Sequence, residues 1–260
     1  MTEPSASGAP WRPPTDLAQG SLAAAAVRLV RAAPRGFWVV MAVLLAVGLA
    51  MDVIARRLGV PLDATPLPLA TWAYLGVVAV VSSAVVGAAL HLLLTGRPPR
   101  RLDAGFAGYV LWSCGGSVLA NGVMSLIAGA QAAPPAELLP RFLAVAVLGL
   151  GGFIVLTRLL LLPTAWLVGD PGATLAGAWG RMRGQLAPYI LASILLTLPV
   201  VMLGVLAVGA AGGSESEPSV AARVVTQMMA TALAGLNAAL NAVIYLRLVG
   251  APQRLAEVSD

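Results

Sequence analysis

The sequence predicts an all-α integral membrane protein, a polytopic membrane helical bundle of about six transmembrane helices plus short interfacial helices. Hydrophobic residues make up 59% of the 260 residues and charged residues only 10%, whereas a soluble domain carries about 25% charged residues. The mean hydropathy is +0.88. Long apolar runs recur along the chain, and crossing a hydrocarbon core takes roughly 20 helical residues. We therefore expect most of the protein surface to face lipid.

The apolar runs are expected to be helices because a spanning segment in lipid must satisfy its own backbone hydrogen bonds. The runs are continuous and lack the alternation that a transmembrane β-barrel needs. Their predicted limits are about 36–55, 69–94, 104–130, 141–168, 186–211 and 220–249. Residues 36–250 thus form the predicted six-helix transmembrane domain.

The flanking segments are polar or Ala-rich. Residues 1–18, rich in Pro, Ser and Ala, are expected to form a disordered cytoplasmic tail. In residues 19–35, Arg28 and Arg31 are three apart and share a helix face. This segment is either an interfacial helix on anionic lipid or an ordinary basic flank of the first span. Residues 251–260 form a second cytoplasmic tail.

The arginines predict the orientation. All 16 basic residues are Arg; 11 lie on the side of the termini, 4 lie on the opposite side and Arg158 lies within a span. The 11 are Arg12, Arg28, Arg31, Arg35, Arg97, Arg100, Arg101, Arg181, Arg183, Arg247 and Arg254. The positive-inside bias therefore places both termini in the cytoplasm and explains the net charge of +5 without a nucleic-acid partner.

Arg158 is the most informative single residue of the predicted spans. An Arg at the centre of a bilayer costs roughly 2.5–3.5 kcal/mol on insertion scales, so it usually faces a bundle interior or cavity. Three interpretations are open: an interior hydrogen-bond or ionic network, snorkelling to the cytoplasmic interface, and contact with a ligand.

Polar partners for Arg158 are available on two other spans. Gln227, Thr231 and Asn241 share a face of the last span, and Asn237 lies one turn before Asn241. The third span carries a stripe of Ser117, Asn121 and Ser125, spaced by four residues. Such groups either join helices by hydrogen bonds or line a polar cavity. The candidate intramembrane polar cluster is Arg158, Asn121, Gln227, Asn237 and Asn241.

Residues 170–185 predict a short amphipathic helix at the cytoplasmic interface. Asp170 is a candidate N-cap and Pro171 suits a helix start. Trp179 is the predicted interfacial anchor, with Arg181 and Arg183 beside it.

This region resembles a bacterial family of six-span proteins related to the membrane domain of some glycerophosphodiester phosphodiesterases. The similarity covers about residues 155–200. It comprises the intramembrane Arg158 followed by Pro163, the acidic turn at Asp170, and the pattern Leu175, Trp179, Gly184 before the next span. Ala178 stands where that family often has Ser. The resemblance implies a multi-pass protein of the bacterial inner membrane whose function is largely undefined, without the phosphodiesterase catalytic domain.

No catalytic or metal-binding motif is found in the sequence. The lone Cys114 has no disulfide partner, and the lone His91 has no Cys, Asp or Glu nearby to complete a metal site. Catalytic triads and phosphate-binding glycine loops are missing, so we expect neither an enzyme nor a cofactor. The leading hypothesis is a scaffold or accessory subunit that binds membrane proteins, lipid or a second copy of itself. The alternative is a small permease with a polar cavity around Arg158.

Overall fold

The computed structural model describes residues 13–18, 20–60, 68–99, 103–131, 135–170, 172–211 and 219–250. All regular structure in these ranges is helical. After the 3-10 helix η1 (Thr15–Ala18), the α-helices are α1 (Leu22–Arg31), α2 (Arg35–Arg57), α3 (Leu69–Thr95), α4 (Ala104–Gln131), α5 (Pro135–Arg158), α6 (Leu161–Leu167), α7 (Leu175–Arg181), α8 (Leu186–Ala211) and α9 (Val220–Leu248). The tail at 1–12 and that at 251–260 lie outside the described residues.

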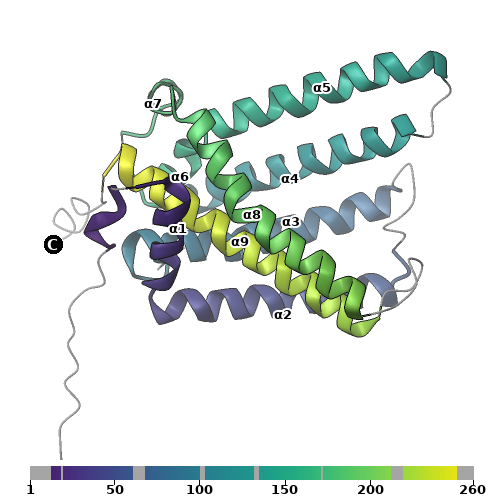
Figure 1. Ribbon diagram of the computed structural model, residues 1–260, viewed down its shortest axis with the longest axis horizontal. Coiled ribbons are helices and arrows are strands. Elements are labelled where there is room, and N and C mark those ends of the chain that lie inside the picture. The colour runs from purple at the N-terminus through teal and green to yellow at the C-terminus, as the bar shows by residue number, and fades with distance from the viewer. Residues whose placement is uncertain are drawn as a thin grey trace, which may run out of the picture.

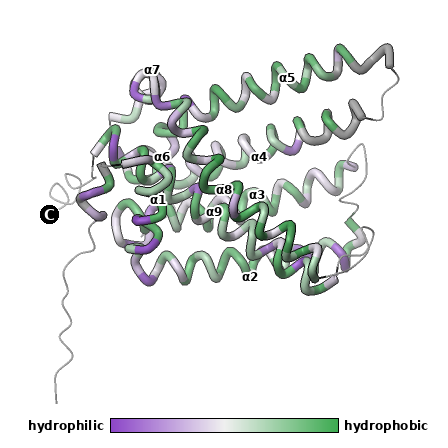
Figure 2. Tube along the Cα trace, in the orientation of Figure 1, coloured by the Kyte–Doolittle hydropathy of each residue, from purple (hydrophilic) through white to green (hydrophobic). Residues whose placement is uncertain are grey.

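The long helices run back and forth between two ends of one bundle (Figure 1). One end holds η1, α1, α6, α7 and the C-terminal end of α9, and we call it the terminal end. The C-terminal ends of α2, α4 and α8 lie at the opposite end, here called the far end. Hydrophobic residues follow the long helices, and hydrophilic residues gather mainly near the helix ends (Figure 2).

Four described helices, α2, α3, α8 and α9, are long and apolar enough to cross a membrane, and α5 with α6 makes a fifth if that bent pair is one span. The 28-residue α4 is not among them. The predicted all-helical class with several candidate membrane spans is thus confirmed for the described residues. The predicted count of six stays a prediction.

The span predicted at 141–168 is broken in the structure. Its two parts, Phe142–Arg158 and Leu161–Leu167, meet at an angle of 44°. Pro163 is the reason, because its ring nitrogen cannot donate to the carbonyl four residues earlier and its ring crowds that carbonyl. The chain instead turns at Leu160, whose N–H donates to the Thr157 carbonyl at 3.3 Å.

The N-terminal elements are folded onto the bundle. Leu17 of η1, in the segment predicted to be a disordered tail, is 4% exposed. Arg247 of α9 holds this segment by donating to the Leu17 carbonyl at 2.7 Å and the Gly20 carbonyl at 3.1 Å. The apolar face of α1 packs against α9 and α8, which leaves Leu29 fully buried. Residues 15–18 are therefore ordered, and protein covers the face of α1 that an interfacial helix would turn to lipid.

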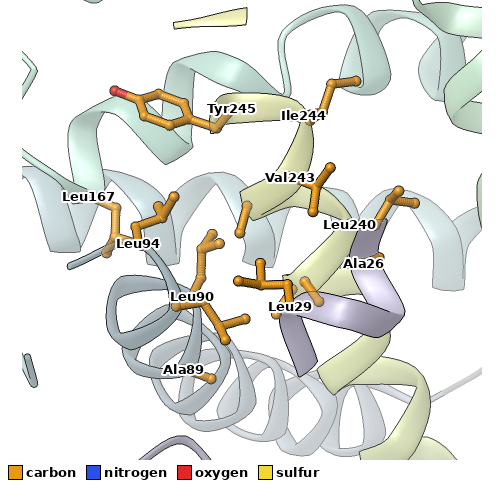
Figure 3. Packing of buried hydrophobic residues seen from close by; sticks show 14 of the residues in the cluster. Ala26, Leu29, Ala89, Leu90, Leu94, Leu167, Leu240, Val243, Ile244 and Tyr245 are labelled. Carbon is orange, nitrogen blue, oxygen red and sulfur yellow. The ribbon is translucent and has the colours of Figure 1, made fainter. Parts of the chain in front are cut away.

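The hydrophobic core lies at the terminal end. Figure 3 shows Leu29 of α1, Leu90 and Leu94 of α3, Leu167 of α6 and Leu240 of α9 converging there. Most of α6 is buried in this core. By contrast, only 17% of the most apolar window of α2 and 17% of that of α8 is buried inside the protein. Among the residues that the structure describes, buried side chains are therefore concentrated at the terminal end.

Two glycines of α4 let α6 approach its backbone closely. A Cβ placed on Gly105 would overlap the carbonyl oxygen of Trp166 and lie 3.0 Å from its carbonyl carbon. A Cβ on Gly108 would lie 3.1 Å from the Trp166 ring. The first turn of α4 therefore requires residues without side chains where α6 crosses it.

Candidate functional site

Arg158 is the last residue of α5 and lies at the terminal end of the bundle. Its guanidinium carbon is 5.4 Å from the centroid of the Trp179 ring, within the range of a cation–π contact. The Nε atom is buried and has no hydrogen-bond partner among the described residues. The structure thus joins the predicted intramembrane Arg to the predicted interfacial Trp.

Three of the other four residues of the predicted polar cluster make contacts with partners outside this pair. Asn121 donates to the Ser117 carbonyl of its own helix at 2.9 Å. Asn241 accepts from the Tyr189 hydroxyl of α8 at 3.0 Å, and Asn237 is half-buried one turn earlier. These bonds engage Asn121 within its own helix and join Asn241 of α9 to α8.

Gln227 makes a different contact, against α2. A Cβ added at Gly48 would overlap Gln227 Oε1 and lie 3.1 Å from its Cδ, so this side chain packs onto the glycine of the neighbouring helix. Gln227 therefore contacts α2, whereas Asn241, further along α9, contacts α8. Small residues here allow two helices to approach, as they commonly do in membrane bundles.

The segment between α6 and α7 is tied to α9 through Asp170. Asp170 Oδ1 accepts from the Gly172 amide at 2.8 Å, and Oδ2 accepts from the Tyr245 hydroxyl at 3.3 Å. The predicted N-cap at Asp170 is therefore wrong. The cap of α7 is Thr174, whose hydroxyl accepts from the Gly177 amide at 3.1 Å, because the helix begins only at Leu175.

The apolar residues of α7 and of the turn after it are divided between the core and the surface. Ala178 and Met182, one turn apart, are buried, whereas Leu175 is 60% exposed and Trp179 is 42% exposed. Arg181 is exposed and lines a crevice beside Asp170 whose volume is only about 10 Å³, about enough for one water. This crevice is too small to bind an organic ligand.

The exposed arginines at the terminal end make it cationic. Arg181 and Arg183 are exposed near α7, and Arg31 and Arg35 are exposed where α1 meets α2. Asp16 pairs with Arg28 at 3.1 Å. Surfaces of this kind attract anionic lipid headgroups.

A polar cavity of about 480 Å³ lies at the α3–α4 connection. His91 Nδ1 is 2.8 Å from the Arg97 carbonyl and 3.1 Å from the Thr95 hydroxyl, and Asp103 caps α4 by accepting from the Phe106 amide at 2.9 Å. The polar groups named here are thus occupied by local structure. No group of three His, Cys, Asp or Glu able to hold a metal occurs among the described residues.

Helix α5 carries an apolar face that the sequence reading did not single out. Leu139, Leu143, Val147 and Leu150 are 69%, 56%, 69% and 63% exposed, and their spacing of four, four and three places them on one side of the helix. The side that carries Gly152 meets α4, where Leu119 packs against this glycine, although Leu148 and Val155 near that side are still 48% and 44% exposed. Contact of α5 with α8 is slight.

An apolar groove lies between α1, α2 and α9. Its volume is about 440 Å³, and its lining includes Val30, Phe37, Met41, Met228 and Gly235. The sequence could not reveal it, because the groove exists only once α2 and α9 pack side by side. Its walls carry no ionisable group.

Comparison with models of protein families, with curated sequences and with solved structures found no match. The resemblance to the membrane domain of glycerophosphodiester phosphodiesterases therefore stays a prediction.

Proposed function

We propose that this chain is a non-catalytic, multi-pass membrane protein that acts as a scaffold or accessory subunit and binds other membrane components. The observation that carries the proposal is the packing of α5. This helix lies along α4, meets α8 only slightly, and presents the apolar stripe Leu139, Leu143, Val147 and Leu150 on its open side.

Several features support a helix of another protein as the occupant of this stripe. A spacing of three and four residues is the pattern by which helices interdigitate along a seam. Few of the core residues that the structure describes lie in the far half of the bundle, and besides α4 the helix α5 meets α8 only slightly. A second helix would supply the packing that membrane helices use in place of the hydrophobic effect.

The test is to extract the tagged full-length chain gently from its own membrane and identify what remains bound. We expect a stoichiometric membrane-protein partner, or a second copy of this chain. Val147→Trp should displace it, because the indole would project from the middle of the stripe. Leu111→Trp on α4, at a site 72% exposed, is the matched control and should retain the partner. A preparation free of any protein partner would argue against the scaffold.

We also propose six spans in a bacterial inner membrane, with both termini cytoplasmic. The alternating course of the six long helices supports the count (Figure 1). At about 1.5 Å per residue, the 28 residues of α4 are long enough to cross a core of about 30 Å. The excess of arginines on the side of the termini supports the orientation.

Single-cysteine labelling in a Cys114→Ala background tests this topology. Leu58→Cys, after α2, should react with a membrane-impermeant maleimide in intact cells, and Arg97→Cys, after α3, only after lysis. The reverse pattern would invert the orientation. Labelling of both sites from one side would show that α3 does not cross the membrane.

A further inference from the structure

The groove between α1, α2 and α9 is lined almost wholly by carbon. Met41 and Met228 form flexible parts of its walls, and Gly235 forms part of its floor. Methionine side chains adapt to irregular apolar partners because they are unbranched and polarisable. The volume of about 440 Å³ lies within the roughly 300–1,000 Å³ of small-molecule sites.

The groove has the length of one leaflet. Its lining on α2 extends from Phe37 to Leu45, which is about 12 Å at 1.5 Å per residue. One leaflet of the hydrocarbon core is about 15 Å thick, half of the whole. Because Phe37 lies in the first turns of α2, the groove starts at the terminal end and stops near the middle of the predicted membrane.

Two arginines, Arg31 and Arg35, lie near the terminal end of the groove. Arg35, Trp38 and Ala42 are spaced by three and four residues, so Arg35 lies about one turn before Trp38 and two turns before Ala42 on the groove side of α2. Arg31 follows the groove residue Val30 on α1. Both arginines are exposed, as a headgroup ligand requires. Trp38, 51% exposed, suits the aromatic belt at this depth.

We propose that this groove holds an acyl chain of an anionic phospholipid from the leaflet at the terminal end, with its phosphate at Arg31 and Arg35. This inference deepens the proposed function by giving the chain a specific lipid, and it rests on the membrane location proposed above. A partner helix fits less well, since a helix about 10 Å across fills roughly 900 Å³ over 12 Å of its length. That is about twice the groove.

The experiment reconstitutes the full-length chain in nanodiscs of phosphatidylcholine and phosphatidylglycerol and counts retained lipid by native mass spectrometry after transfer to detergent. Wild type should retain phosphatidylglycerol in preference to phosphatidylcholine. Ala232→Trp, which fills the groove from α9, should reduce retention severalfold. Arg31→Gln with Arg35→Gln should lower the preference about 25-fold, since each basic residue near an anionic surface contributes about fivefold.

Matched controls separate the groove from general effects. Ala46→Trp, exposed one turn beyond Ala42 on α2, and Arg57→Gln, exposed at the other end of that helix, should both retain lipid like wild type. If Ala232→Trp does not give a monodisperse protein, Ala42→Trp fills the groove from the opposite wall.

Three results would overturn the inference: no retained lipid in wild type, equal retention of both lipids, or unchanged retention in the groove-filling variant. Capture of a protein that Ala232→Trp displaces would replace the lipid with a partner helix. Different results test the proposed scaffold function. Val147→Trp should leave lipid retention intact, and a chain that binds phosphatidylglycerol but no protein would refute the scaffold alone.

Discussion

Replacing Gly105 with Ala should destabilise the protein even though Ala favours helix. The added Cβ would overlap the carbonyl oxygen of Trp166 and sit 3.0 Å from its carbonyl carbon. These are backbone atoms of α6, which is buried in the core and cannot rotate away as a side chain would. Either α4 must move from α6, or α6 must leave its place in the core.

The expected change in the free energy of unfolding is the difference between two opposing contributions. Overpacking a tight contact typically costs about 1–3 kcal/mol. Ala in place of Gly contributes about 0.8–1.0 kcal/mol in a helix interior, which is an upper bound at Gly105, the second residue of α4. Because the obstacle here is backbone, we expect the cost near the upper end and a net loss of about 1–2 kcal/mol. For a chain of about this size, that corresponds to roughly 2–8 °C in the unfolding midpoint.

The assay is the temperature at which half of the detergent-solubilised protein loses its monodisperse size-exclusion peak. Gly115→Ala is the matched control. It lies on the same helix, and nothing is within 4 Å of its Cβ position, so only the gain in helix propensity remains. We expect Gly115→Ala to raise the midpoint and Gly105→Ala to lower it. A Gly105→Ala protein as stable as the Gly115→Ala protein would refute the close approach of α4 and α6.

Two further substitutions test the terminal end. Trp179→Ala removes the ring that contacts Arg158 and should lower the unfolding midpoint by roughly 1–4 °C, because an exposed cation–π pair contributes about 0.5–1 kcal/mol. Trp179→Phe keeps a ring and should lower the midpoint less. Equal decreases in the two variants would count against the ring contact. Arg247→Met removes the hydrogen bonds to the carbonyls of Leu17 and Gly20, so trypsin should cleave within α1 faster than in wild type, and an unchanged rate would show that Arg247 does not hold this segment.

The helical class and most helix limits could be predicted because lipid leaves a spanning chain few alternatives. The break at Leu160 was also within reach of the sequence, since Pro163 disfavours a continuous helix through the preceding turn. The burial of α6 was not, because Leu161 and Leu162 read the same whether they face lipid or protein.

The polar cluster shows why site prediction from spacing is harder. The spacing correctly placed Ser117 and Asn121 on one face of a helix. In the structure, Asn121 donates to the Ser117 carbonyl within its own helix. The residue pattern does not distinguish this bond from one to another helix. Arg158 lies over the Trp179 ring, a contact that the spacing of the polar residues did not indicate. Tertiary packing decides which helices become neighbours, and the local spacing of residues in one sequence does not reveal it.

The contact between the two extremes of the chain bears on how the protein is made. Arg247 binds the Leu17 carbonyl 230 residues away, and α1 packs against α9. At about 5–20 residues per second, a ribosome needs roughly 10–50 seconds to cover that distance. Throughout that interval the apolar face of α1 has no α9 to cover it, while α2, α3, α4 and α5 can already pack against their neighbours. Burial of this face is thus completed only after α9 has been made, and we expect a chain truncated before α9 to leave it largely uncovered.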